Sequence, residues 1–290
     1  MRVATYNILN GGCGREDTLA RVVETIQPDV LGLQEVVSPE FVLSLAERLG
    51  FSSVMSQVSG RTNVALLSRF PILRSASYQP LPFSKPVLEV ELQVPPDQTL
   101  TVFVLHLRVD PELPFERRRL REILAALEIA RSRRDRPILL MGDLNALEPG
   151  APIRVEPMLK LAQSVAARRH TRTSAWSGIP RSAYDRVARI LLALPRGPVQ
   201  WLMSRIVRRR VIQAVLAEGY VDLFRRLNAP STPGYTSPAD DPGLRIDYVF
   251  ATPDLAERCS RCEVFISGLT RRASDHCPVV CEFSIEGDGS

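Results

Sequence analysis

The feature that most constrains the fold is a short apolar run near the middle of the chain. The run spans residues 137–142, reads Pro-Ile-Leu-Leu-Met-Gly, and continues into Asp143, Leu144 and Asn145. An apolar run of this length, entered from a proline and closed by a glycine, predicts a fully buried strand. Because side chains alternate along an extended chain, we expect Asp143 and Asn145 to lie on the same side at its end.

The polar end of this strand allows two interpretations. An acid and an amide at the mouth of a buried strand suit the handling of a phosphate and a metal ion. Gly142, Asp143 and Asn145 are equally typical of an ordinary turn at a strand end. Other parts of the chain have to decide between a site and a turn.

Length and composition indicate a chain that can bury a large core. The sequence has 290 residues, of which 45% are hydrophobic and 24% are charged. No apolar run approaches the roughly 20 residues that span a bilayer, and Met1-Arg2 leads directly into strand-like sequence instead of a signal peptide. The five cysteines form no dense framework, which suits a reducing compartment. We therefore expect a cytoplasmic protein.

Four of the cysteines raise the question of a zinc site. Cys259 and Cys262 form a C-x-x-C pair, and Cys277 and Cys281 follow downstream. Four thiolates can hold zinc, but the second pair is spaced differently and falls in a predicted strand. We interpret these cysteines as small buried hydrophobic residues.

The pattern of apolar residues predicts short strands and amphipathic helices along most of the chain. Strands are predicted over residues 2–7, 30–33, 52–58, 63–68, 72–78, 87–94, 100–107, 137–142, 220–224, 245–250, 261–267 and 278–285. Helices are predicted over residues 17–27, 38–50 and 115–132. Residues 286–290 are expected to form a frayed tail.

Eight polar residues interrupt or end the apolar extended runs. They are Asn7, Glu35, His106, Asp143, Asn145, Asp247, Asp275 and His276. Taken singly, each has an ordinary explanation as a turn former, a solvated strand end, a core histidine or an ion-pair partner. Strand ends on one rim of a sheet converge, and loops there carry function on a rigid scaffold. The shared position of all eight favours one site.

The residue types in this set suit the cleavage of a phosphate ester. Glu35 offers hard oxygen atoms of the kind that Mg²⁺ prefers. Asp275 stands beside His276, one of only three histidines, and Asp247 is a further acid that can hold the His276 ring in one tautomer. Hydrolysis needs an activated water, a clamp for the phosphate oxygens and stabilisation of the leaving group. This set offers groups for all three tasks.

Six sequence blocks, in order along the chain, resemble the endonuclease/exonuclease/phosphatase superfamily. The blocks are Thr5–Leu9, Leu33–Val36, Leu105–Leu107, Met141–Ala146, Arg245–Phe250 and Ser274–Val279. The resemblance implies a four-layer α/β/β/α sandwich of two mainly antiparallel sheets with helices outside. It also implies a single domain over residues 1–285 that includes a basic helical insert at residues 151–218.

The resemblance further implies a divalent-metal-dependent phosphodiester hydrolase. Its cofactor is expected to be Mg²⁺, with Mn²⁺ able to substitute. By position in the matching blocks, Glu35 is the principal metal ligand, Asn7 assists at the metal, and Asp275 is a second ligand.

Catalytic roles follow from the same resemblance. Asp143 orients the attacking water, and Asn145 holds the phosphate. His276 is the general base or stabilises the transition state, and Asp247 orients it. His106 stands where the deoxyribonuclease and sphingomyelinase branches have a histidine.

Two departures from the family pattern narrow the choice of substrates. Leu9 stands where the abasic-site enzymes have an aspartate near the metal, which weakens that assignment. Arg245-Ile246-Asp247 replaces the Cys-Asp-Arg signature of the inositol polyphosphate phosphatases, so inositol phosphates are disfavoured.

The basic charge is concentrated in the insert. Residues 151–218 hold thirteen Arg and Lys against three acids, a local charge of +10, so the rest of the chain carries about −5 of the net +5. Two helix-like segments lie within residues 183–217. They fit a helical pair packed on the sandwich with a solvated Arg face, a clamp on a phosphate backbone, or an interfacial pair docked on anionic lipid.

These observations rank the candidate functions. A nuclease acting on DNA or RNA comes first, with Asn63, Arg208, Arg209 and Arg210 as candidate substrate-binding residues. The alternative is a sphingomyelinase-like phospholipid phosphodiesterase or a small-molecule phosphatase that docks on an anionic membrane surface through the insert. A sandwich that only binds DNA or lipid comes third. Nothing in the sequence indicates an obligate protein partner.

Overall fold

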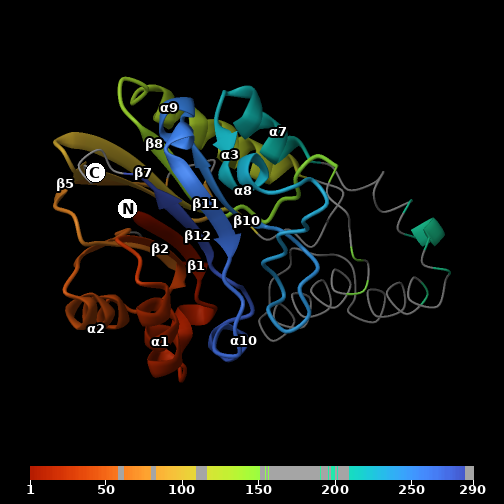
Figure 1. Ribbon diagram of the computed structural model, residues 1–290, viewed down its shortest axis with the longest axis horizontal. Coiled ribbons are helices and arrows are strands. Elements are labelled where there is room, and N and C mark those ends of the chain that lie inside the picture. Colours follow the sequence, from red (N-terminus) through yellow and green to blue (C-terminus); the bar gives the residue numbers. More distant parts are fainter. Residues whose placement is uncertain are drawn as a thin grey trace.

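Two six-stranded sheets lie face to face, and helices cover the outer face of each (Figure 1). The computed structural model describes residues 1–57, 62–79, 83–108, 116–150 and 209–284, with residues 154, 156, 190, 195, 197–199 and 201. The predicted α/β/β/α sandwich is confirmed. Hydrophobic clusters fill the space between the sheets and the space between each sheet and its helices.

The strand order of each sheet differs from the order along the chain. The first sheet runs β11 (Cys259–Val264), β12 (Val279–Phe283), β1 (Arg2–Asn7), β2 (Val30–Val36), β4 (Asn63–Ser68), β3 (Ser52–Met55). The second runs β5 (Ile72–Tyr78), β6 (Val87–Val94), β7 (Gln98–His106), β8 (Ile138–Asp143), β10 (Asp247–Ala251), β9 (Val221–Asp222). Only β1–β2 and β7–β8 are parallel pairs, so both sheets are mainly antiparallel.

The outer layers are helical. The helices of the described part of the chain are η1 (Asn10–Gly12), α1 (Glu16–Ile26), α2 (Pro39–Leu49), α3 (Arg117–Arg131), α7 (Arg210–Ala217), α8 (Leu223–Leu227), α9 (Pro253–Glu257) and α10 (Thr270–Ala273). The apolar faces of α1 and α2 pack on the first sheet, and those of α3 and α7 pack on the second. Each fully buried leucine in these layers contributes about 2 kcal/mol. None of the helices described is long and apolar enough to cross a membrane.

The start and the end of α2 are explained by the residues that cap the helix. Ser38 precedes the helix, and its Oγ accepts the Phe41 N–H at 3.4 Å, while Pro39 fills the first turn. The helix ends at Gly50, whose φ of 67° is left-handed.

The predicted strand over residues 220–224 is wrong after its first residues. The strand β9 spans only Val221–Asp222, and the helix α8 begins at Leu223. Asp222 Oδ1 accepts the Arg225 N–H at 3.2 Å, the geometry of a helix N-cap. This cap ends the strand, since the apolar run alone does not distinguish a strand from a helix.

Only the end of the basic insert falls within the described residues. The helix α7 packs on α3 through Val211, Ile212 and Val215, and Arg210 donates its backbone N–H to Glu116 Oε2 at 2.6 Å. Of the interpretations of the insert, α7 therefore fits the one in which its helices pack on the sandwich. Arg208, most of the other insert residues and the predicted tail lie outside the described residues.

Two parallel strands approach closely at Gly142. In the register of β7 and β8, Leu105 lies opposite Gly142, and His106 lies opposite Asp143. Gly142 has a φ of 142°, and a Cβ atom there would lie 1.9 Å from the Leu105 carbonyl oxygen. Only glycine therefore lets the two strand ends meet with His106 and Asp143 side by side.

We expect Gly142→Ala to lower the free energy of unfolding by more than about 3 kcal/mol, because the added methyl group overlaps a backbone carbonyl that has no room to move. Urea denaturation measures this difference. Gly268→Ala is the control, since a Cβ at Gly268 meets nothing within 4 Å and its φ is ordinary. Equal stability of the two variants would contradict the close approach.

Candidate active site

Polar side chains from both sheets meet at one end of the sandwich. Asp143 and His106 end β8 and β7, and Asp247 begins the antiparallel neighbour β10, so all three lie at the same sheet end. Asn7 ends β1 in the facing sheet, and its Nδ2 donates to Asp143 Oδ2 at 3.0 Å. Asn7 and Asp143 are each 1% exposed, so this hydrogen bond ties the sheets together inside the protein.

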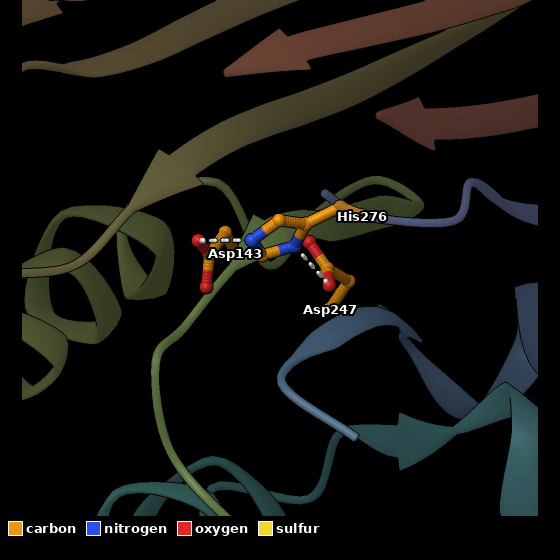
Figure 2. Close-up of side chains that lie close together, drawn as sticks. All are labelled: Asp143, Asp247 and His276. Atoms are coloured by element: carbon orange, nitrogen blue, oxygen red, sulfur yellow. Dashed lines mark hydrogen bonds and ion pairs between the residues drawn. The ribbon is translucent and has the colours of Figure 1, made fainter. Parts of the chain in front are cut away.

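His276 lies between two carboxylates (Figure 2). Its Nδ1 is 2.8 Å from Asp247 Oδ2, and its Nε2 is 4.0 Å from Asp143 Oδ2. Asp275 Oδ1 also lies 4.0 Å from Nε2. The structure thus places Asp247 where it can fix the ring, and leaves the other ring nitrogen facing Asp143.

Ser274 holds this histidine against β1. Its Oγ donates to the Asn7 carbonyl oxygen at 2.6 Å and accepts the His276 N–H at 3.2 Å. Thr236 holds the backbone at Asp247 in a similar way, because its Oγ1 accepts the N–H groups of Ile246 and Asp247. These hydroxyl groups fix the backbone from which the acid and the imidazole project.

Burial and neighbouring charges set the protonation of these groups. Burial, together with the charge of Asp247, raises the pKa of Asp143 to about 7, although His276 and Lys85 act against it. Burial alone would lower the pKa of His276, but the charge and hydrogen bond of Asp247 raise it to about 10. His276 is therefore an imidazolium at neutral pH, whereas Asp143 titrates near neutrality.

His106 differs from His276 in its charge. Its Nε2 lies 3.5 Å from Asp143 Oδ2, and its ring is buried. Burial, with the positive charges of Lys85 and His276, holds the pKa of His106 well below its usual value. Two imidazoles therefore flank Asp143, one charged and one neutral.

Asn145 is both a turn residue and a neighbour of the acid. Its N–H donates to Asp143 Oδ1 at 2.9 Å, its Nδ2 donates to the Leu107 carbonyl oxygen at 3.0 Å, and its φ is 46°. Asn145 therefore has the backbone geometry of a turn residue at a strand end, as one of the two interpretations expected. This geometry does not exclude a site, because the turn aims both side chains at the same strand end.

Glu35 sits on an irregular stretch of β2. Its φ is 62°, and the pairing of β2 with β4 shifts between Gln34 and Val36. Glu35 Oε2 accepts the N–H of Asn10, which follows β1, at 2.8 Å. Leu9, Asn10 and Asn145 also have positive φ, and such strained positions cluster at functional sites.

Of the predicted substrate-binding residues, Asn63, Arg209 and Arg210 fall within the described part of the chain. Asn63 begins β4 opposite Val36, hence at the same sheet end as Glu35, and its Oδ1 accepts the Ser56 hydroxyl at 3.0 Å. Arg209 and Arg210 lie at the start of α7 in the outer helical layer.

Three residues that contact the predicted site residues were not themselves predicted: Lys85, Ser274 and Thr236. Lys85 Nζ lies 3.0 Å from His106 Nδ1 and 2.5 Å from Nε2. Its signal was its rarity, since only two of the 37 basic residues are lysines. Ser274 stands inside a block already singled out, whereas Thr236 lies in a Pro- and Gly-rich loop and gave no signal.

The donor set fits a hard divalent cation. Four carboxylic acids, Glu35, Asp143, Asp247 and Asp275, share this end of the sandwich with two basic groups, Lys85 and His276, so negative charge is in excess. Asp247 Oδ1 is buried without a hydrogen-bond partner among the described residues. Oxygen donors with excess negative charge are what Mg²⁺ and Mn²⁺ bind.

The tightest group differs from the predicted metal ligands. Among the described residues, Asp143, Asp247 and His276 are the acids and histidines whose ligand atoms lie within 4.8 Å of one another. A protonated imidazole repels a cation and has no free lone pair. His276 is therefore a poor ligand, and the side of the site that holds Glu35 suits a cation better.

The fold and this site define a class of protein, the α/β/β/α enzymes with an acid–histidine centre at one end of the sandwich. A model of the Endonuclease/Exonuclease/phosphatase family matches residues 4–276, and the chain belongs to that family. It is an enzyme with the fold of the family's phosphodiesterases and nucleases.

Relatives cover nearly the whole chain. Exodeoxyribonuclease III of Haemophilus influenzae is 25% identical over 302 residues, which cover 98% of this chain and 100% of that protein. The Neisseria 3′ phosphatase NExo, solved with a product DNA hairpin, is 20% identical with a TM-score of 0.67, covering 98% of this chain and 99% of its own. An AP endonuclease from Archaeoglobus fulgidus is 20% identical with a TM-score of 0.64, covering 98% and 100%. The two solved structures share the fold.

We expect His276 of the metal-free protein to be charged and His106 to be neutral over a wide pH range. NMR of the imidazole groups, assigned with His276→Gln and His106→Gln, should show His276 protonated at pH 8 and His106 neutral at pH 5.5. In urea both should titrate near the ordinary 6.5.

The sign of the stability effect follows from the raised pKa. The contribution of His276 to the free energy of unfolding is complete below about pH 6.5 and is lost as the pH rises through about 10. Titration of both rings near 6.5 in the folded protein would contradict the assigned environment.

Proposed function

We propose that the protein is a Mg²⁺-dependent phosphodiesterase that hydrolyses nucleic acid. The observation that carries this proposal is the environment of Asp143. One carboxylate meets an amide from the facing sheet, the backbone N–H of Asn145, and a charged and a neutral imidazole. A water molecule held there would lie beside groups that can bind both a phosphate and a developing negative charge.

Metal binding is assigned to the oxygen donors on the Glu35 side of the site. Glu35 is the principal ligand, Asn7 assists, and Asp275 is a second ligand. When bound, the cation supplies Lewis-acid stabilisation of the phosphate oxygens. Mn²⁺ is expected to substitute, because it accepts the same hard oxygen atoms.

The side chains of the protein activate the water, stabilise the transition state and bind the phosphate. Asp143 orients the attacking water, and its pKa of about 7 suits it to accept a proton at neutral pH. His276, held by Asp247, presents an imidazolium to the phosphate, which favours transition-state stabilisation over the role of general base. Asn145 binds a phosphate oxygen, and His106 lines the other side of Asp143.

Nucleic acid is the substrate that the comparisons favour. A relative that matches 98% of this chain is named an exodeoxyribonuclease, and a protein of the same fold was solved with a DNA product. Arg209 and Arg210 remain candidates for contacts to the phosphate backbone beyond the reacting group.

We expect wild-type protein to hydrolyse bis(4-nitrophenyl) phosphate with Mg²⁺ or Mn²⁺ and to stop on addition of EDTA. Asp143→Asn should lower kcat by about 10³-fold or more, because the attacking water loses its acceptor. Asp254→Asn is the control, since Asp254 is exposed beyond the opposite end of β10. Full activity of Asp143→Asn would remove this residue from the mechanism.

A substrate panel tests the nucleic-acid assignment. Duplex DNA, single-stranded DNA, RNA and sphingomyelin vesicles are offered at equal phosphate concentration with Mg²⁺. We expect kcat/KM for at least one nucleic acid to exceed that for vesicles by about 10²-fold, and to fall with added salt as phosphate contacts are screened. Preferential turnover of the vesicles would overturn the nucleic-acid assignment while leaving the phosphodiesterase chemistry intact.

A further inference from the structure

Lys85 occupies a position that the proposed mechanism leaves unused. It is the only lysine among the described residues, and the chain has just one other, Lys160. Its side chain reaches the ring of His106, with Nζ 3.0 Å from Nδ1 and 2.5 Å from Nε2. The ammonium group thus lies one imidazole away from Asp143.

A buried acid of the outer helix layer fixes the backbone next to Lys85. Glu122, on α3, accepts the Ser84 N–H on Oε1 at 2.9 Å and the Arg108 N–H on Oε2 at 3.1 Å. One carboxylate therefore fixes the residue before Lys85 and the segment that follows His106. Such support from packed elements is what a side chain needs if it is to keep a fixed direction in a site.

The charge of Lys85 is not neutralised by a close ion pair. Within the described residues no carboxylate lies within ion-pair distance of Nζ, although Glu35, Asp143 and Glu122 attract it from further away. An ammonium group has three N–H donors, and the ring of His106 accepts only one. Within the described part of the chain Nζ has no acceptor besides this ring, so the remaining donors can bind an oxygen atom that enters the site.

Burial makes this ammonium group costly to keep. Removal from water disfavours the charged form, and it lowers the pKa of Lys85. An apolar side chain would fill the same space without that cost. A partly buried cation held beside the reacting centre is therefore better explained by function than by stability.

The neighbouring imidazole does not supply the charge. His106 is neutral because burial and Lys85 hold its pKa well below the usual value. Of His106 and Lys85, the two groups next to each other on this side of Asp143, Lys85 is therefore the one that carries a positive charge. A lysine suits this task because its compact charge fits against one oxygen atom, whereas the planar fork of arginine needs two.

We propose that Lys85 is a further catalytic residue, whose ammonium group contacts the reacting phosphate on the His106 side and stabilises the negative charge that develops there. This inference rests on the proposed phosphodiesterase function. As water attacks, it gives one proton to Asp143, the new O–P bond forms, and the bond to the leaving oxygen breaks with its electron pair on that oxygen. Lys85 keeps its proton throughout and hydrogen-bonds to an oxygen atom whose charge increases.

The test compares Lys85→Met and Lys85→Arg with Arg21→Met, a control that removes an exposed positive charge on α1. We expect Lys85→Met to lower kcat on bis(4-nitrophenyl) phosphate by about 10²-fold or more with a smaller change in KM. Lys85→Arg should recover part of that loss. The thermal midpoint of Lys85→Met should match or exceed that of the wild type, which a structural role would not allow.

A second measurement separates this inference from the proposed function. Binding of inorganic phosphate in the presence of Mg²⁺, measured by calorimetry, should weaken about tenfold in Lys85→Met and stay unchanged in Arg21→Met. If the wild type hydrolyses no phosphodiester but phosphate binding still depends on Lys85, the function fails and the anion contact stands. If the wild type is active and Lys85→Met keeps kcat within about twofold, the role of Lys85 is overturned. Unchanged phosphate binding in an inactive protein overturns both.

Discussion

The hydrogen bond between Asn7 and Asp143 joins the two sheets at the end where the polar residues gather. Its donor comes from β1 and its acceptor from β8, 136 residues later in the chain. A buried carboxylate needs partners, and Asp143 finds one in each sheet because Asn145 supplies the other. The geometry around Asp143 therefore exists only when the two sheets pack face to face and when β7 and β8 pair closely at Gly142.

Electrostatics at this end of the sandwich works against stability. Several acids lie close to two basic groups, and burial shifts the pKa values of Asp143 and Lys85 in the direction that favours their neutral forms. Leu9 and Glu35 add backbone conformations that such residues rarely adopt. The apolar layers of the sandwich hold these groups together, and the excess of acid is what a divalent cation would offset.

Most strands and helices of the fold could be predicted, because the sequence patterns that specify them are local. Asp143 and Asp247 were predictable as site candidates, since each stands at one end of an apolar run that a periodicity rule identifies. Lys85 was not, because its partner His106 is 21 residues away and nothing in the loop around it is periodic. Glu122 resembles any solvated acid on a charged helix, and only packing shows that it is buried. Asp222 read as a strand residue although its carboxylate caps a helix.

The position of a bound cation shows whether Glu35 is the principal metal ligand. Crystals grown with Mn²⁺ can be measured at its absorption edge, so that an anomalous difference map locates the ion without reference to activity. We expect a dominant peak within about 2.5 Å of a Glu35 carboxylate oxygen, at the end of the sandwich where Asn7 and Asp143 meet. A dominant peak elsewhere in the protein, with none at Glu35, would contradict it.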